Sequence, residues 1–251
     1  MPLKVLFSNI GYAKGISGSL RDHILLFHRH VYCRPTVQTA ALSELKKLIE
    51  EHKPDICCIV EVDKGSFHCA YLDQLSFLIS DKYSHSDIAD KYGEKSWLAR
   101  MPLHGGRSNA FLARQYFPFE KFFFTHGTKR LIYRIEVAED LHLFFTHFSL
   151  KKDVRKKQFR EIRQLIKQTP GEVILLGDFN IMGGFSELQP LLKNKALTLL
   201  NPDDIHTFTF HKRKMILDLC LCSKNIAKAA SLEIIPQKFS DHAALLAEFN
   251  F

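Results

Sequence analysis

The sequence has no uninterrupted run of about 18 apolar residues, the length that a helix needs to cross a membrane. Its N-terminal residues, 1–9, become polar too early for a signal peptide and predict a first strand instead. No Pro-, Gly- or Ser-rich linker and no internal repeat divides the 251 residues. We therefore expect one domain over residues 1–251, which has no transmembrane segment and works in the cytoplasm as a monomer.

The sequence also lacks the cysteine spacing of zinc and redox sites, because none of its six cysteines forms a Cys-x-x-Cys pair. Cys57 and Cys58 lie in an apolar run, and Cys220 and Cys222 are two residues apart, so they share one face of a strand. A free cysteine commonly behaves as a small buried hydrophobic residue. We predict that these cysteines belong to the core.

Acidic residues are too few to balance the basic ones, and the formal net charge is +8. Much of the excess lies in residues 151–168, which contain eight lysines and arginines but only two acidic residues. The basic residues of this segment are Lys151, Lys152, Arg155, Lys156, Lys157, Arg160, Arg163 and Lys167. A basic surface attracts nucleic acid, anionic lipid or phosphorylated metabolites, and the charge alone does not distinguish them.

Apolar residues spaced three and four apart predict helices over residues 39–52 and 153–169, with weaker patterns at 21–31 and 186–194. In the helix over 153–169, the basic residues are expected on the face opposite the apolar one. The remaining apolar runs, including 130–137, 141–146 and 216–222, predict strands. Many strands and few helices indicate an α/β fold of two packed sheets with helices outside. Residues 11–35 and 80–107 are candidates for specificity loops or for plain surface decoration.

The most informative motif is an apolar run at 173–176 that ends in Gly177-Asp178-Phe179-Asn180. A buried strand that stops in this way delivers a carboxylate and an amide to the rim of a sheet. Asp241 and His242 directly precede a second apolar run, 243–249. Two such strand ends can face one cleft and present acid, amide and imidazole groups to a phosphate.

Five further segments each place polar residues in or at the end of an apolar run. They are 5–9 (ending in Asn9), 56–61 (ending in Glu61), 108–112 (with Asn109), 144–148 (with His147) and 216–218 (ending in Asp218). In this order, the set resembles the endonuclease/exonuclease/phosphatase superfamily, whose members are metal-dependent phosphoesterases. The matching segments run from residue 4 to residue 249. The resemblance implies a four-layer α/β sandwich, with two packed mixed β-sheets flanked by helices and the active site at one edge.

The resemblance assigns Glu61, Asn9 and Asp241 to a divalent cation, Mg²⁺ or Mn²⁺, which prefers oxygen ligands. Glu61 also stands out by itself, because a carboxylate at the end of an apolar strand is costly to bury unless a cation compensates. The alternative is an acid at an exposed strand–loop junction.

Asp178 is the candidate for orienting or deprotonating the attacking water. Asn180 points to the same side if the backbone stays extended, and its amide can then donate to a phosphoryl oxygen. An Asx-turn that closes the loop is the alternative. His242 is expected to donate to the phosphate as an imidazolium, with Asp218 as the partner that the family implies.

His147 narrows the resemblance to the branch that holds pancreatic-type deoxyribonucleases, sphingomyelinases, deadenylases and tyrosyl-DNA phosphodiesterases. The signature of inositol 5-phosphatases is absent around Asp218. Asn109 and the basic triplet Lys212, Arg213 and Lys214 are candidates for substrate binding, the triplet because it precedes Asp218 and can line the cleft rim.

The leading hypothesis is a metal-dependent phosphodiesterase that acts on nucleic acid. A phospholipid phosphodiesterase of the sphingomyelinase type, or a phosphatase of a lipid or small metabolite, is the alternative among enzymes, although no apolar membrane-docking loop stands out. From another class, the chain is a catalytically inactive binding protein on the same scaffold. The retained acids and histidines argue against that last interpretation.

Overall fold

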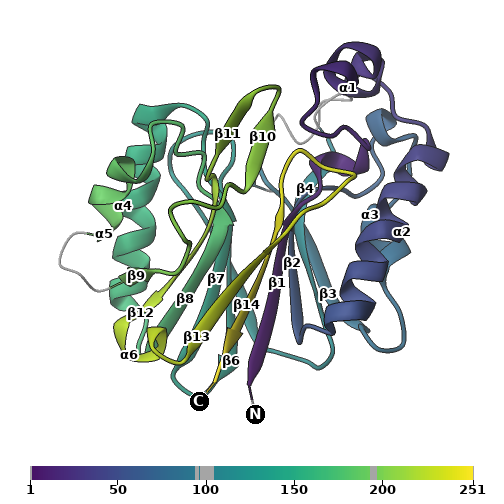
Figure 1. The fold of residues 1–251 in the computed structure, drawn as a ribbon. Helices are drawn as coiled ribbons and strands as arrows, with labels where there is room; N and C mark the ends of the chain where they lie inside the picture. Colours follow the sequence, from purple (N-terminus) through teal and green to yellow (C-terminus); the bar gives the residue numbers. More distant parts are fainter. Residues whose placement is uncertain (1, 94–95, 97–104, 193–196, 251) are drawn as a thin grey trace.

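The computed structural model describes residues 2–93, 96, 105–192 and 197–250. These residues form two six-stranded sheets that pack face to face, with helices on the outer face of each sheet (Figure 1). Helices α2 (Pro35–His52) and α3 (Gln74–Leu78) cover the first sheet, and α4 (Lys152–Gln168) and α5 (Gln189–Leu192) cover the second. The predicted four-layer α/β sandwich is confirmed.

Both sheets contain parallel and antiparallel neighbours. The order in the first is β13 (Ala230–Ile235), β14 (Ala244–Phe249), β1 (Leu3–Asn9), β2 (Ile56–Asp63), β4 (Arg107–Ala113) and β3 (His85–Asp90). The order in the second is β5 (Phe119–Phe123), β6 (Leu131–Ala138), β7 (Leu141–His147), β8 (Glu172–Asp178), β12 (Asp218–Ser223) and β9 (Leu197–Leu199). A separate hairpin joins β10 (Phe208–Phe210) to β11 (Arg213–Met215).

Each sheet contains one parallel pair, β1 with β2 in the first and β7 with β8 in the second. Parallel strands end at the same edge of a sheet, so each pair brings two carboxyl-terminal residues together. In the second sheet, His147 is level with Asp178, and Asp178 is level with Asp218 of the antiparallel neighbour β12. The pairing of the strands therefore positions these three side chains.

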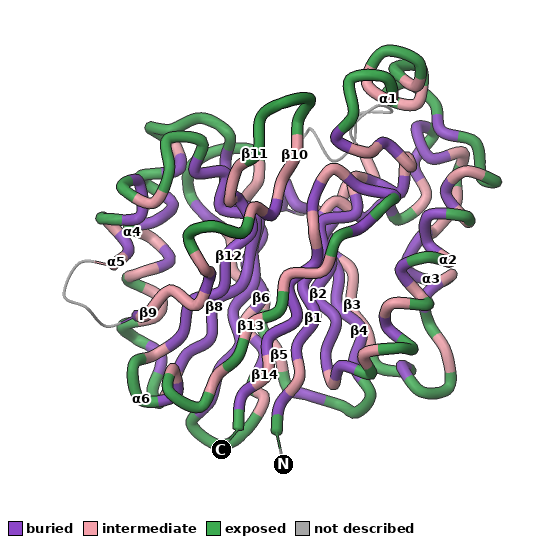
Figure 2. The backbone as a smooth tube through the Cα atoms, viewed as in Figure 1, coloured by how far each residue is buried: buried purple, intermediate pink, exposed green. Residues whose placement is uncertain are grey.

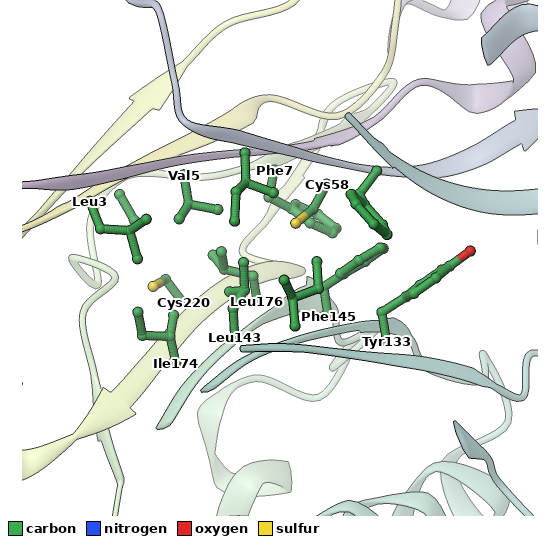
Figure 3. Close-up of a cluster of buried hydrophobic side chains, with 14 of the residues drawn as sticks. Leu3, Val5, Phe7, Cys58, Tyr133, Leu143, Phe145, Ile174, Leu176 and Cys220 are labelled. Carbon is green, nitrogen blue, oxygen red and sulfur yellow. The ribbon is translucent and has the colours of Figure 1, made fainter. Parts of the chain in front are cut away.

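The core between the sheets is built from alternate residues of the central strands, as expected when successive side chains point to opposite faces (Figure 3). Leu3, Val5 and Phe7 of β1 face side chains from the second sheet, among them Phe145. Phe145 stacks on Tyr133 with ring centroids 4.7 Å apart. All six cysteines are free and buried, which confirms that they are core residues.

Helix α4 differs from its prediction at one basic residue. The segment places most of its lysines and arginines on an exposed face, but Arg155 is only 2% exposed. Its guanidinium donates to the carboxylate of Glu187 and to the carbonyls of Ser149 and Leu150. Arg155 therefore ties the helix to the loop after β8, and it is not part of the basic surface.

The helix predicted over residues 21–31 is divided into α1 (Leu20–Leu25) and a 3₁₀ turn, η2 (Phe27–His30). The hydroxyl of Ser19 caps α1 by accepting from the amide of Asp22, and neither piece contributes a buried residue. Residues 21–31 thus have the apolar spacing of a helix that packs on a core, but their apolar side chains are not buried. Figure 2 shows this segment as largely exposed, above the buried strands.

Two other predicted segments are only partly described. The insert at 80–107 contains β3, and its residues 94–95 and 97–104 lie outside the described part of the chain. The short helix predicted at 186–194 is a 3₁₀ turn, η5 (Phe185–Leu188), followed by α5, with residues 193–194 outside the described part. Among the helices of the described residues, none has the length and apolar character that a membrane span requires.

Truncation of Phe145 to alanine should lower the free energy of unfolding by about 3–5 kcal/mol, because it removes a fully buried ring from the inter-sheet core. The matched substitution Phe27→Ala removes a ring that is 66% exposed and should change stability by less than about 0.5 kcal/mol. Urea denaturation of both variants measures the difference. Equal losses for the two would show that the inter-sheet core is not the main source of stability.

Candidate active site

Five of the predicted site residues meet at one edge of the sandwich because their strands end or begin there. Asn9 ends β1, His147 ends β7 and Asp178 ends β8. Asp218 begins β12, which runs antiparallel to β8, and Glu61 lies near the end of β2. The first sheet thus contributes an amide and a carboxylate, and the second contributes an imidazole and two carboxylates, to the same place.

The carboxylate of Asp178 is the centre of this group, and only 2% of the residue is exposed. Its Oδ2 atom lies 3.0 Å from His147 Nε2, and it accepts a hydrogen bond of 3.1 Å from the amide of Asn9. The Nε2 atom of His242 lies 4.0 Å from the same oxygen. Burial raises the pKa of Asp178, but the imidazoles of His147 and His242 outweigh that effect and lower it, so the group is an anion at neutral pH.

His242 is paired with Asp218, the partner that the sequence analysis proposed. The Nδ1 atom of His242 lies 2.8 Å from Asp218 Oδ2. Burial lowers the pKa of His242, yet the carboxylates of Asp218 and Asp178 raise it to about 10. The hydroxyl of Thr207 accepts from the backbone amide of Asp218 and fixes the start of β12. His242 is therefore an imidazolium at neutral pH, with its Nε2 side toward Asp178.

The backbone conformation at Asn180 differs from the extended one in which its side chain would point to the same side as that of Asp178. Its φ of 53° is left-handed, so the chain is not extended at this point. Its backbone amide donates to Asp178 Oδ1 at 3.1 Å, which is the Asx-turn alternative, and its side-chain amide donates to the carbonyl of Phe148 at 3.0 Å. The condition of an extended backbone is therefore not met, and the Asx-turn is present, with the residue held beside Asp178.

Glu61 is set into the site by a β-bulge. Strand β2 continues to Asp63, but its pairing with β4 shifts between Val60 and Val62, and Glu61 has a φ of 55°. A bulge of this kind re-aims a side chain that the pleat would otherwise direct elsewhere. The carboxylate lies 3.8 Å from Lys129 Nζ and 3.8 Å from His147 Nδ1. Neither separation is a hydrogen bond, so the oxygens keep lone pairs available.

Lysines that the sequence analysis did not select surround Glu61. Burial raises the pKa of Glu61, but Lys129, Lys91 and other cations reduce it to about 2. Lys129 Nζ contacts His147 Nε2, and the ammonium of Lys91, which is 5% exposed, contacts the hydroxyl of Tyr12. No spacing signal marks these lysines, because they come from loops that only the fold brings to the site.

Two sets of side chains could hold a cation. Within the described residues, one group of acids and histidine has ligand atoms within 4.8 Å of one another: Asp178, Asp218 and His242. In that group, a proton already joins Asp218 to His242, and a cation would have to break the pair. Glu61 and Asp241 offer a second set.

The electrostatics of Glu61 and Asp241 fit a cation better. Burial raises the pKa of Asp241, and the negative charge of Glu61 raises it further, so these two carboxylates repel one another. A divalent cation with carboxylate ligands would relieve that repulsion. Asn9 lies beside them, and its Oδ1 atom accepts from the amide of Gly11 with a second lone pair to spare.

The remaining candidates flank this centre in different ways. Asn109 is in β4, level with Val60, and its Oδ1 atom has no hydrogen-bond partner among the described residues. Lys212, Arg213 and Lys214 are exposed on the β10–β11 hairpin. A β-bridge pairs Phe208 of this hairpin with His242. The hairpin therefore rises directly beside the catalytic imidazole candidate.

A hollow next to His242 is lined by the hairpin and by the insert after η1 (Gly11–Ala13). Its lining residues include Thr207 and Thr209 from the segment of the hairpin, and Ser17 and Gly18 from the insert. Gly18 is required for this approach, because a Cβ atom there would lie 2.1 Å from the carbonyl oxygen of Thr209. Its own carbonyl accepts from the amide of His211 at 2.6 Å. The insert is thus fastened to the rim of the site.

The sequence comparison agrees with this geometry. The model of the endonuclease/exonuclease/phosphatase family matches residues 37–242. No curated protein sequence matches the chain.

Solved structures of related fold cover the whole chain at low identity. TDP2 of D. rerio, complexed with a single-strand DNA product, is 15% identical with a TM-score of 0.67, over 100% of this chain and 99% of that one. The catalytic domain of human nocturnin, with a bound sulfate anion, is 17% identical with a TM-score of 0.62, over 100% of this chain and 94% of that one. The endonuclease domain of TRAS1, a telomere-specific non-LTR retrotransposon, is 14% identical with a TM-score of 0.60, over 99% of both chains.

The substitution Asp218→Asn tests the pairing of Asp218 with His242. Removing the carboxylate should lower the pKa of His242 from about 10 by well over one pH unit, because Asp218 is the largest cause that raises it. NMR titration of the imidazole C–H resonances measures the change, with the circular dichroism spectrum as the control for folding.

The same pair makes stability depend on pH. Because the pKa of His242 in the folded protein exceeds its ordinary value of 6.5, the contribution of this histidine is complete below about pH 6.5. It is lost as the pH rises through about 10, so wild-type stability should fall over this window more than that of Asp218→Asn. A histidine that titrates identically in both proteins would contradict the pairing.

Proposed function

Because the chain belongs to the endonuclease/exonuclease/phosphatase family, we propose that it is a divalent-metal-dependent phosphodiesterase that hydrolyses nucleic acid. The observation that carries this proposal is the buried contact network of Asp178, His147, His242 and Asn9, with Glu61 and Asp241 alongside. It supplies an anion, an imidazolium that is charged at neutral pH, and spare oxygen ligands at one edge of the fold.

Glu61, Asp241 and Asn9 are the residues that we propose as holders of Mg²⁺ or Mn²⁺. Such a cation, when bound, stabilises the negative charge that develops on the phosphoryl oxygens during hydrolysis. Glu61 is deprotonated over the whole neutral range, since its pKa is about 2. It therefore needs no proton release before it binds a cation.

The other residues act on the water and on the phosphate. Asp178 is anionic and fully sequestered, so it can accept a hydrogen bond from the attacking water and hold or remove its proton. His242, charged by its pairing with Asp218, can donate from Nε2 to a phosphoryl oxygen. Asn180 and Asn9 border the same carboxylate and supply amide N–H groups.

Nucleic acid is the proposed substrate because of the charge on the rim. The exposed triplet Lys212, Arg213 and Lys214 is carried by the hairpin that pairs with His242. Cationic side chains at this place would bind backbone phosphates on either side of the one that is cleaved. TDP2 of D. rerio, which shares the fold, forms a complex with single-strand DNA.

Chelation of divalent metal should abolish the hydrolysis of a phosphodiester, and Glu61→Gln should reduce it by roughly 100-fold or more. Isothermal titration with Mn²⁺ should show weaker binding for Glu61→Gln in the absence of any substrate. The matched control is Glu51→Gln, an exposed glutamate at the end of α2. Full turnover in excess chelator would refute the metal requirement.

Replacement of Lys212, Arg213 and Lys214 by alanine should weaken DNA binding and leave turnover at saturation nearly unchanged, because these side chains do not reach the reacting phosphate. The slope of log affinity against log salt should become shallower by about 0.9 for each backbone phosphate that the variant no longer neutralises. The control removes the same charge from α4 with Lys156→Ala, Lys157→Ala and Lys167→Ala. DNA binding that is absent at low salt, or insensitive to salt, would exclude nucleic acid as the substrate.

A further inference from the structure

The insert between η1 and α2 carries an unusual number of exposed apolar side chains. Eight of the fourteen large hydrophobic residues exposed in the described part of the chain belong to it or to the neighbouring turn η3 (Phe67–Cys69) and the residues after it. We define its apolar surface as Leu20, Ile24, Leu25, Phe27 and Val31, which are between 49% and 66% exposed. Exposed apolar groups gathered in this way mark an interaction site more often than scattered ones do.

Three aromatic residues extend this surface. The ring of Phe67 lies 5.8 Å from that of Tyr32 and 6.2 Å from that of Tyr71, and all three residues are exposed. The carbonyl of Val31 bonds the Nδ1 atom of His68, which joins the insert to η3. The aromatic residues therefore continue from the end of the apolar surface.

Contacts with the rest of the fold hold the insert in one position, so its apolar face is an ordered surface. The guanidinium of Arg29 donates to the carbonyls of Lys14 and Gly15. Gly18 accepts from the amide of His211 in the β10–β11 hairpin, and the ring of His23 lies 4.7 Å from that of Phe210. Folding thus fixes Ile24 and Phe27 outward instead of burying them.

Two exposed arginines, Arg21 and Arg34, lie beside the apolar surface. The other two basic residues of the insert are used within the fold: Lys14 is partly buried and interacts with Glu61, and Arg29 is bonded to backbone carbonyls. Residues 11–43 contain a single acid, Asp22. The carboxylate of Asp22 is already engaged by Ser17, which donates from both its hydroxyl and its amide. The basic triplet of the hairpin stands at the same end of the molecule (Figure 1). The surface is thus apolar with a cationic border.

Two of the possible occupants fit this chemistry poorly. Nucleic acid bases could stack on Phe67 and the other exposed aromatic rings, but they would leave the aliphatic side chains of Leu20 and Ile24 without a matching partner. A second copy of the chain would bring the cationic borders of both copies together and would be repelled. An anionic bilayer fits both parts, since side chains such as these insert at the acyl boundary while arginines and lysines meet the headgroups.

We propose that the apolar surface of the insert docks the protein on an anionic lipid membrane. The docked orientation would turn the edge that carries Asp178 and His242 toward the bilayer, because the insert and the hairpin line the hollow beside His242. This proposal rests on the surface alone and stands whether the phosphodiester that is cleaved belongs to nucleic acid or to lipid.

Flotation with vesicles tests the docking. The wild-type protein should bind vesicles of an equal mixture of phosphatidylglycerol and phosphatidylcholine, and it should not bind vesicles of phosphatidylcholine alone. The double substitution Ile24→Asp with Phe27→Asp should reduce binding by at least about 10-fold, since it removes two inserting side chains. Arg21→Gln with Arg34→Gln should reduce it by roughly fivefold for each charge and weaken its dependence on salt.

The matched control is Tyr116→Asp. Tyr116 is as exposed as Phe27 but follows the C-terminal end of β4, outside the apolar surface, so this substitution should leave vesicle binding unchanged. Unchanged thermal melting of all variants verifies folding. Equal binding by wild type and by Ile24→Asp with Phe27→Asp would overturn the proposal. The proposal would also be overturned if sedimentation showed a wild-type dimer that Ile24→Asp with Phe27→Asp dissociates. It would likewise be overturned if the wild type did not bind vesicles and this variant lost binding to a single-stranded oligonucleotide.

Discussion

The burial of the Asp178 carboxylate is the constraint on which the active-site edge depends. An anion that is 2% exposed is costly unless donors surround it, and here those donors come from both sheets. His147 belongs to the strand beside it, whereas Asn9 ends a strand of the opposite sheet. The apolar core between the sheets therefore does more than stabilise the fold. The packing of the core sets the distance between the two sheets, and so the distance between Asn9 and Asp178. A change in the core packing would therefore also change the geometry of the site.

The second constraint is the positive charge of the lysines that gather around Glu61. Burial in a medium of low polarity disfavours every ammonium group that loses its water, and it lowers the pKa of Lys91 to about 7. Lys129 and Lys91 nonetheless lie close enough to Glu61 to lower the pKa of its carboxylic acid to about 2, and Lys129 also lowers the pKa of Asp178. These ammonium groups favour the approach of an anion to this edge, which is consistent with the phosphoester substrates that the family hydrolyses.

The sequence predicted the ends of the buried strands well. An apolar run indicates a buried strand, and the Asp, Asn or Glu that follows it marks the residue at which the strand ends. Asn9 and Asp178 end their strands as these patterns indicated, whereas Asp218 begins β12 and does not end a strand. The pattern failed where the backbone leaves its regular course, at the bulge of Glu61 and the left-handed turn of Asn180. Lys129 and the other lysines of the site escaped notice because a loop residue carries no periodicity. The single-domain expectation, the cytoplasmic location and the monomeric state stay predictions.

The insert shows most clearly what periodicity omits. Apolar residues repeat in the same way whether a helix faces a core or faces outward, so the pattern at residues 21–31 could not reveal that Ile24 and Phe27 are exposed. The structure also removes the argument that disfavoured lipid, namely the absence of an apolar docking surface. Hydrolysis of a phosphodiester makes the same demands on Asp178 and His242 whether the ester belongs to DNA or to a phospholipid. The choice of substrate therefore lies in the rim, where a basic hairpin suits any polyanion but an apolar surface suits only a partner that can receive aliphatic side chains.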